Sequence, residues 1–236
     1  MKKIIVSLIA VIAVSAAFAY PTLSGGQGGI DVQNAYVTEK NTISVTQFVN
    51  EDATWPTITM AVPLYNSAEL YASYTNEGGA NQEEVVSSLF SIGAKVALPV
   101  DFLGCDIAVG GNYSKAWSIN ELSGYVAVSR DFFGMTATVN YTYSQSESFG
   151  DSVSNEKWAF NVDKAITNKV NVGLEFTAAT YDYSIVPDYF YGWESSSKAR
   201  GAAYARAAFA DNFAMQAAVA NIGQKAKFTL GGALTF

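Results

Sequence analysis

Seven charged side chains lie at polar positions of segments in which polar and apolar residues alternate. Acids and bases facing one confined space can select the solutes that pass through it. Alternatively, they can pair with one another and pack the interior shut through hydrogen bonds. Small residues on the same side leave room and favour a passage. The seven candidate pore-lining residues are Glu69, Lys95, Asp106, Asp163, Glu175, Arg206 and Lys227.

The chain lacks the side chains on which most hydrolytic enzymes depend. It contains no histidine, which removes Ser-His and Asp-His arrangements and the usual general base near neutral pH. The single cysteine, Cys105, excludes an intrachain disulfide framework. Its neighbours on the same side are Ile107 and Val109, so we interpret it as a small apolar residue. We predict no catalytic residue and no enzymatic activity.

Two further segments could bind a ligand but lack the required pattern. The segment from Asn76 to Ser88 carries Glu77, Glu83 and Glu84 without the regular spacing of a calcium loop. The glycine-rich segment 24–30 is followed by no Lys-Ser or Lys-Thr pair and preceded by no strand, so it does not predict a phosphate site. We therefore predict neither a metal nor a cofactor.

Composition points away from a soluble or nucleic-acid-binding protein. The formal net charge is −7, so the chain repels nucleic acid. Aromatic residues make up 14% of the sequence and charged residues only 15%, whereas charge is near a quarter in most soluble domains. Apolar residues are abundant but dispersed, and no run after the first residues is long enough for a membrane helix.

Alternation with a period of two predicts strands throughout the chain. In the clearest case, Val170, Val172, Leu174 and Phe176 alternate with polar or small residues. The polar side is mostly Gly, Ala, Ser, Thr and Asn, whereas a strand facing bulk water would carry many Lys and Glu. This pattern indicates that the apolar side faces lipid and the small polar side faces a lumen.

The pattern predicts an all-β fold, a transmembrane antiparallel up-and-down β-barrel of about twelve strands, with ten as the alternative. Even numbers are typical of single-chain barrels of this kind. Short turns alternate with longer connections, which include 76–88, 147–155 and 184–197. The predicted strands are 42–49, 57–64, 68–75, 89–98, 104–114, 122–129, 134–146, 156–163, 169–183, 198–209, 213–220 and 226–236.

The first residues have the pattern of a secretory signal peptide. Lys2 and Lys3 precede the apolar run 4–14, and Ala17 and Ala19 supply small residues before a cleavage site. We predict cleavage after Ala19. The expected organisation is a signal peptide at 1–19, a periplasmic N-terminal segment at 20–41 and a barrel at 42–236. Residues 20–41 either hang in the periplasm or fold up into the mouth of the barrel.

The chain ends on a strand whose last residue is aromatic. Phe228, Leu230, Leu234 and Phe236 alternate with small or polar residues. This ending resembles the carboxyl-terminal signal of bacterial outer-membrane β-barrel proteins, a group that includes the porins. The resemblance implies a location in the outer membrane of a Gram-negative bacterium, with outer-membrane lipid and the barrel assembly machinery, which recognises the strand ending at Phe236, as partners.

The start of the expected mature chain carries a second resemblance. Pro21-Thr22-Leu23-Ser24-Gly25-Gly26-Gln27-Gly28-Gly29-Ile30 is similar to the mature start of YjbH-type outer-membrane proteins, which implies a link to exopolysaccharide export. Members of that family usually continue with Pro-Thr-Ala or Pro-Ser-Ala, whereas this chain has Val32-Gln33-Asn34-Ala35 and is shorter.

Aromatic residues gather at both ends of the predicted strands. Rings at the two water interfaces are expected for a membrane barrel, because an amphipathic ring is most stable there. The tryptophans lie at the loop ends and the phenylalanines at the turn ends. The predicted interface aromatics are Trp55, Trp117, Trp158, Trp193, Phe102, Phe132, Phe133, Phe213 and Phe236.

Two functions follow from this reading. The first is a porin-like passive channel for small solutes. The alternative is a closed barrel with a structural, adhesion or surface-assembly role through its outer loops, of which 184–197 is rich in aromatic rings that can stack on surface glycans or anchor at the interface. A secreted soluble barrel that binds a ligand inside is a weaker third reading.

Overall fold

The computed structural model describes residues 20–30, 32–49, 54–77, 87–116, 119–148, 151–180, 199–223 and 226–236. These residues form twelve β-strands and the segment that precedes the first of them. The strands are β1 (Thr42–Val49), β2 (Thr54–Leu64), β3 (Ala68–Glu77), β4 (Ser87–Phe102), β5 (Cys105–Ala116), β6 (Ile119–Phe132), β7 (Met135–Ser148), β8 (Asp151–Ala165), β9 (Val170–Thr180), β10 (Arg200–Ala210), β11 (Phe213–Ile222) and β12 (Lys227–Thr235). No helix in the described ranges is long and apolar enough to cross a membrane.

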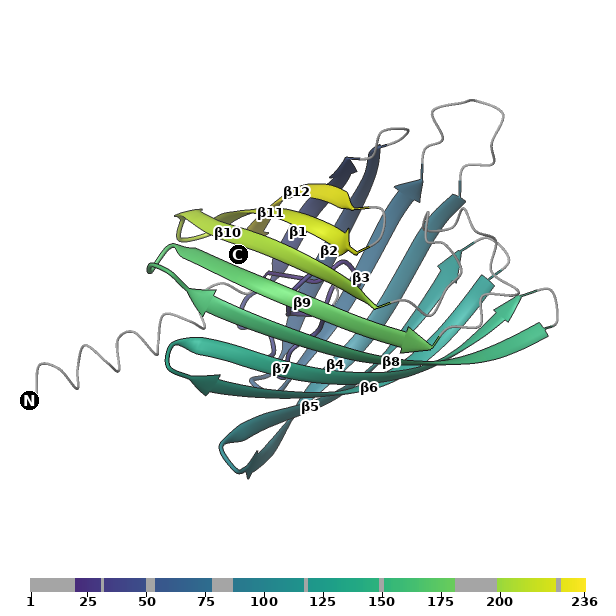
Figure 1. Cartoon of the computed structure of the whole chain (residues 1–236), viewed down its shortest axis with the longest axis horizontal. Helices are drawn as coiled ribbons and strands as arrows, with labels where there is room; N and C mark the ends of the chain where they lie inside the picture. Colours follow the sequence, from purple (N-terminus) through teal and green to yellow (C-terminus); the bar gives the residue numbers. More distant parts are fainter. Residues whose placement is uncertain are drawn as a thin grey trace, which may run out of the picture.

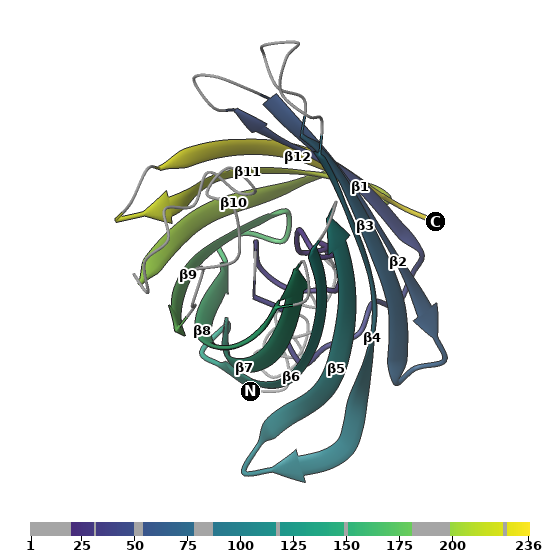
Figure 2. The same cartoon turned by 90° about the vertical axis from the view of Figure 1, so that its right-hand side faces the viewer.

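The strands form one closed barrel in which each pairs antiparallel with its sequence neighbours (Figures 1 and 2). The last strand returns to the first, and β1 pairs with β12 along its whole length, from Thr42 opposite Thr235 to Val49 opposite Phe228. Closure leaves no free sheet edge, so the main-chain groups of every strand have a partner on both sides. The predicted fold and the number of strands are confirmed.

Side chains alternate between an apolar outer face and a polar inner face. On β9, Leu174 is 65% exposed and Phe176 is 47% exposed, whereas Gly173, Glu175 and Thr177 are buried. Hydroxyl pairs link neighbouring strands on the inner face, for example Ser44 with Thr59 and Ser129 with Thr138. The polarity of the barrel is therefore the reverse of that of a soluble β protein, as the alternation predicted.

Several strands extend further than the sequence indicated. Strand β8 begins at Asp151, and pairing with β7 continues to Ser148 opposite Asp151. The prediction of a long connection over 147–155 is therefore wrong: most of this segment is strand. Its residues are too polar to show an apolar face, because this end of the hairpin has no apolar side to bury. Of the predicted connection 76–88, residues 78–86 lie outside the described residues, and the predicted connection 184–197 lies outside them entirely.

The two turns that carry Asp-Phe-Leu-Gly and Asp-Phe-Phe-Gly share one geometry. Leu103 and Gly104 have φ angles of 58° and 73°, and Phe133 and Gly134 have 49° and 72°. Two successive positive φ values are typical of the type I′ turn that joins tightly paired strands, and glycine fits its second position without strain. The shared sequence thus corresponds to shared turn chemistry.

Tyrosine rings cover glycines on the inner face. Tyr71 lies opposite Gly93, Tyr125 opposite Gly110, and Tyr204 opposite Gly173 on neighbouring strands. In each pair the ring occupies the space where a glycine Cβ would stand. At these three positions the small residues that were expected to leave room for a passage accommodate a ring instead.

We predict that a charge on the outer face destabilises the barrel in lipid. Replacing Leu174 with Arg places a cation at mid-strand against hydrocarbon and is expected to lower the free energy of unfolding in lipid vesicles by about 2–4 kcal/mol. The matched control is Asn168→Arg, at an exposed turn residue. Urea titrations in vesicles would measure both, and equal stabilities of the two variants would contradict a lipid-facing position for Leu174.

Candidate functional site: the lumen and its N-terminal segment

The lumen contains the segment that precedes β1. Tyr20, Ile30, Val32 and Ala35 are each only 1% exposed although they belong to no barrel strand. Figure 2 shows this part of the chain inside the ring of strands. We call residues 20–36 the plug; residues 37–41 connect it to β1. Of the two placements expected for residues 20–41, the structure shows the one inside the barrel.

The plug has a compact fold of its own. The Thr22 N–H donates to the Gly26 carbonyl at 2.7 Å, and the Leu23 N–H donates to the Ile30 carbonyl at 2.9 Å. Isolated bridges join Pro21 to Gln27 and Gly28 to Gln33. Ile30 and Leu23 pack against an apolar cluster on β10 and β11 formed by Ala202, Tyr204, Ala218 and Ala220.

The glycine-rich sequence has a steric purpose. A Cβ at Gly29 would collide with Glu175 Oε1, and a Cβ at Gly28 would collide with the carbonyl of Val32. Gly25 has a φ of 109°, which side chains other than glycine rarely adopt. Glycines at these places let the plug backbone approach both the barrel wall and itself.

Arg206 and Glu175 hold the centre of the plug by its main chain. Arg206 Nη2 donates to the carbonyls of Gly28 and Gly29 at 2.8 and 2.9 Å. Glu175 Oε1 accepts from the Ile30 N–H at 2.5 Å. The guanidinium also lies 4.4 Å from the ring centroid of Tyr204, within cation–π range, and Nε donates to Gln216. One cation and one anion thus bind neighbouring carbonyl and amide groups.

A buried ion pair on β3 and β4 binds the plug from the side of the barrel opposite Arg206 and Glu175. Lys95 Nζ lies 2.9 Å from Glu69 Oε1, and both side chains are 0% exposed. Glu69 also accepts from the Gln27 N–H at 3.0 Å and from the Thr38 N–H at 2.7 Å, while Lys95 donates to the Gln27 carbonyl at 3.2 Å. These hydrogen bonds offset part of the cost of burying the two charges.

A third set of contacts is centred on Gln33. The Tyr125 hydroxyl donates to Gln33 Oε1, and Asn140 Nδ2 donates to the Gln33 carbonyl at 3.1 Å. Next to it, the Ala35 N–H donates to Ser129 Oγ at 2.9 Å. The plug therefore contacts strands all around the barrel, and nearly all of these hydrogen bonds join a wall side chain to plug main chain.

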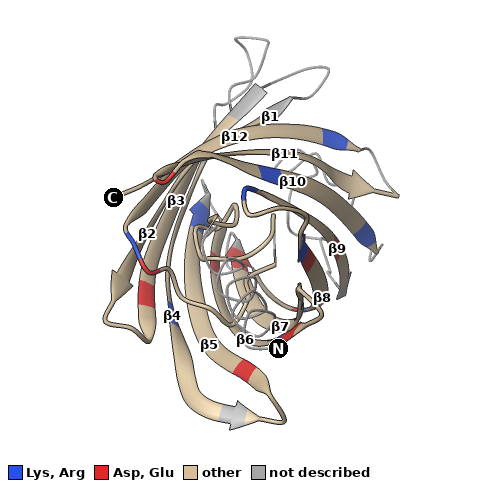
Figure 3. Cartoon of the chain, turned by 90° about the vertical axis from the view of Figure 1, so that its left-hand side faces the viewer, with Lys and Arg blue, Asp and Glu red and all other residues tan. Residues whose placement is uncertain are grey.

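A cavity of about 1260 Å³ remains between residues 36–40 and the wall. Its lining includes Tyr65, Asn66, Asn168 and Lys169 of the short turns, so it lies at the end of the barrel that carries them. Figure 3 looks into this end and shows acidic and basic positions around the lumen.

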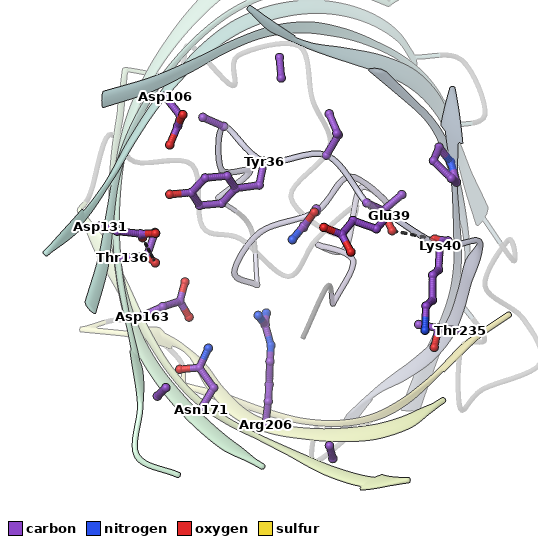
Figure 4. A pocket seen from close by; sticks show the side chains of 18 of the residues that line it. Tyr36, Glu39, Lys40, Asp106, Asp131, Thr136, Asp163, Asn171, Arg206 and Thr235 are labelled. Carbon is purple, nitrogen blue, oxygen red and sulfur yellow. Dashed lines mark hydrogen bonds between the residues drawn. The ribbon is translucent and has the colours of Figure 1, made fainter. Parts of the chain in front are cut away.

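Opposite charges occupy different sides of this cavity. Asp106, Asp131 and Asp163 lie along one wall, on β5, β6 and β8, whereas Arg206 and Lys40 reach in from other directions (Figure 4). Among the described residues no salt bridge within contact distance involves these three carboxylates, although the positive charge of Arg206 acts on Asp163. An acidic wall in a confined, partly desolvated space attracts cations and repels anions.

Tyr36 stands beside this acidic wall, with its hydroxyl directed toward Asp106 and Asp131 (Figure 4). Burial raises the pKa of the Tyr36 phenol, and the negative charges of Asp131 and Asp106 raise it further. The phenol therefore stays protonated across the physiological range and adds no charge to the cavity.

All seven predicted charged residues point to the inside of the barrel, but they do different things there. Glu69, Lys95, Glu175 and Arg206 bind the plug. Asp106 and Asp163 line the cavity. Lys227 is 2% exposed on the inner face of β12. Their role in lining an open pore stays a prediction, because the plug fills the space beside four of them.

The predicted interface aromatics are described only in part. Phe102, Phe132, Phe133, Phe213 and Phe236 lie at strand ends or in turns at the short-turn end. Trp158 is 49% exposed in the middle of β8, because that strand begins earlier than predicted. Trp117, Trp193 and the side chain of Trp55 lie outside the described residues. Anchoring at a membrane interface remains a prediction for all nine.

Three polar wall residues that bind the plug were not predicted from the sequence. Tyr125, Asn140 and Ser129 are inner-face residues of β6 and β7; the first two bind Gln33, and Ser129 accepts from the Ala35 N–H. The sequence could have placed these wall residues inside the barrel, because they fall at the alternate strand positions that are small or polar and face the lumen. Nothing in the sequence paired them with Gln33, which precedes the barrel by several residues.

No protein-family model and no curated protein sequence matches the chain. Solved structures do share its fold. The KdgM porin, solved in complex with disordered oligogalacturonate, superposes with a TM-score of 0.65 at 11% identity, covering 83% of this chain and 99% of that one. The NanC porin gives 0.63 at 10% identity, covering 83% and 98%.

The outer membrane protein Omp33 of Acinetobacter baumannii gives a TM-score of 0.53 at 11% identity, covering 84% of this chain and 98% of that one. At these identities the likeness concerns the fold. The chain thus has the barrel fold found in outer-membrane porins over nearly the whole length of these proteins.

We predict that Glu69 and Lys95 stabilise the protein only as a pair. Replacing Lys95 with Met leaves a buried carboxylate without its cation and is expected to lower the free energy of unfolding by about 3 kcal/mol. The double variant Glu69→Gln/Lys95→Met removes both charges and should recover most of that loss. Urea unfolding of the two variants would measure this, and a double variant no more stable than Lys95→Met would contradict the coupling.

Proposed function

We propose that the protein is an outer-membrane channel that passes small solutes passively through the barrel lumen. In this proposal the signal peptide is cleaved after Ala19 and the barrel inserts into the outer membrane of a Gram-negative bacterium. The observation that carries it is a closed barrel with an apolar outside and a charged inner cavity of about 1260 Å³. The fold shared with porins supports the same conclusion.

The outer face supports a membrane location. Large apolar side chains stay exposed along the middle of the strands, for example Ile92 at 49%, Phe160 at 44% and Leu230 at 56%. A band of this size in water would drive aggregation, whereas hydrocarbon is a suitable solvent for it. The partners that follow are outer-membrane lipid and the barrel assembly machinery, which would recognise the strand ending at Phe236.

The inner charges indicate which solutes suit the channel. The wall formed by Asp106, Asp131 and Asp163 favours cations and neutral polar molecules over anions. A polyanion such as the oligogalacturonate bound by the KdgM porin would be repelled at this wall. We propose small cationic or neutral solutes, and we assign no enzymatic role.

A closed barrel with a structural, adhesion or surface-assembly role is the second candidate. The plug favours it, because the plug contacts most of the wall and occupies much of the lumen. Under this alternative the outer loops would bind partners such as surface glycans. The YjbH-like start of the mature chain belongs to this alternative through its implied link to exopolysaccharide export.

Planar-bilayer recordings separate the two functions. We expect discrete current steps from the purified protein and, in a potassium chloride gradient, a reversal potential of the sign that indicates cation preference. Boiled and unboiled samples on a denaturing gel would verify that the inserted protein is folded. Folded, inserted protein without current above background would reject the channel and leave the structural role.

A charge variant provides the control for selectivity. Asp106→Asn/Asp131→Asn/Asp163→Asn removes the acidic wall and is expected to move the reversal potential at least halfway toward zero. Glu147→Gln, on an exposed outer position of β7, removes a charge without touching the lumen and should leave the potential unchanged. An unchanged potential in the triple variant would show that other residues set the selectivity.

A further inference from the structure

The plug is joined to the barrel at one end only. It continues through residues 37–41 into β1, and no barrel strand precedes it among the described residues. None of the plug residues that the structure describes takes part in the pairing of the twelve barrel strands. The plug can therefore move out of the lumen without breaking any strand pairing of the barrel.

The charged contacts that hold the plug, unlike the apolar packing of Ile30 and Leu23, are of a kind that water can replace. Arg206, Glu175, Glu69 and Lys95 bind carbonyl and N–H groups of the plug. If the plug leaves, water fills the lumen and solvates these charges, so no buried ion is left without a partner. The tether keeps the plug at high effective concentration, so rebinding is rapid.

From these observations we propose that the plug is a displaceable gate, and that Arg206, Glu175 and the Glu69–Lys95 pair are its latch. In the bound state the plug blocks the lumen beside the four latch residues. Its release joins the cavity at the short-turn end to the rest of the lumen. This inference rests on the proposed channel function and names the element that controls it.

The fit at Gly29 makes the latch sensitive to a single methyl group. An added Cβ would meet Glu175 Oε1, the atom that accepts the Ile30 N–H, and also Asn161 Nδ2. Gly124 provides the matched control, because it lies on the outer face of β6 and an added Cβ there has its nearest neighbour at 3.9 Å.

The decisive experiment locks the plug in the full-length chain. Ala35 and Ser129 are both buried, and the Ala35 nitrogen lies 2.9 Å from Ser129 Oγ, so cysteines at these positions are neighbours and are the pair chosen for cross-linking. The variant is Ala35→Cys/Ser129→Cys/Cys105→Ala, in which the native thiol is removed to prevent mispairing. Single-channel current is recorded first from the oxidised variant and then from the same variant after a reductant is added.

We expect the oxidised protein to stay closed and the reduced protein to open. Mass spectrometry of the oxidised sample would verify the bond. If the verified disulfide leaves the current unchanged, the gate is rejected while the channel function stands. If neither this variant nor the unmodified protein conducts in any state, the channel function fails and the gate fails with it.

The glycine variants give a second measurement on chains that keep every charge. Gly29→Ala is expected to raise the open fraction roughly tenfold, the shift that corresponds to losing one charge-assisted hydrogen bond. Gly124→Ala should match the unmodified protein. Equal open fractions in both variants would contradict a latch at Glu175.

Discussion

Closure of the barrel between β1 and β12 is the constraint on which the rest of the structure depends. In hydrocarbon an unpaired main-chain group has no water to bind, so a sheet with free edges is not a stable solution. Pairing from Thr42–Thr235 to Val49–Phe228 removes both edges at once. It also encloses a space that is shielded from lipid, and every polar residue of the chain that faces away from the outer surface must find partners there.

The N-terminal segment is the main partner that these residues find. Because β1 starts at the short-turn end, the residues before it enter the lumen directly. Four charged wall residues then bind N–H and carbonyl groups of the plug main chain, which are present in almost any sequence. Glycines at 25, 28 and 29 allow that main chain to approach the barrel wall and itself closely. The charges that suggested a pore thus bind an occupant of the lumen instead.

The sequence predicted the barrel well and its contents poorly, for a physical reason. Alternation along β9 reports which solvent each side of a strand meets, so the inward position of Glu175 could be predicted from Leu174 and Phe176 alone. The partner of Glu175 could not, because Ile30 contributes only its N–H, which every residue other than proline possesses. The glycine cluster is evident in the sequence. Its role is not, because it depends on how closely the plug backbone approaches the wall, and only the three-dimensional structure gives that distance. The length of β8 was missed because polar strands carry no apolar face to detect.

The central claim is that the plug occupies the lumen and is held there by its main chain. Amide hydrogen exchange in lipid nanodiscs tests it most directly, since the N–H groups of Gln27, Ile30, Ala35 and Thr38 donate to wall side chains. The account predicts exchange far slower than in a free peptide but faster than at the strand amides of β6, because the plug opens without unfolding of the barrel. Exchange at the free-peptide rate at these four amides would contradict it.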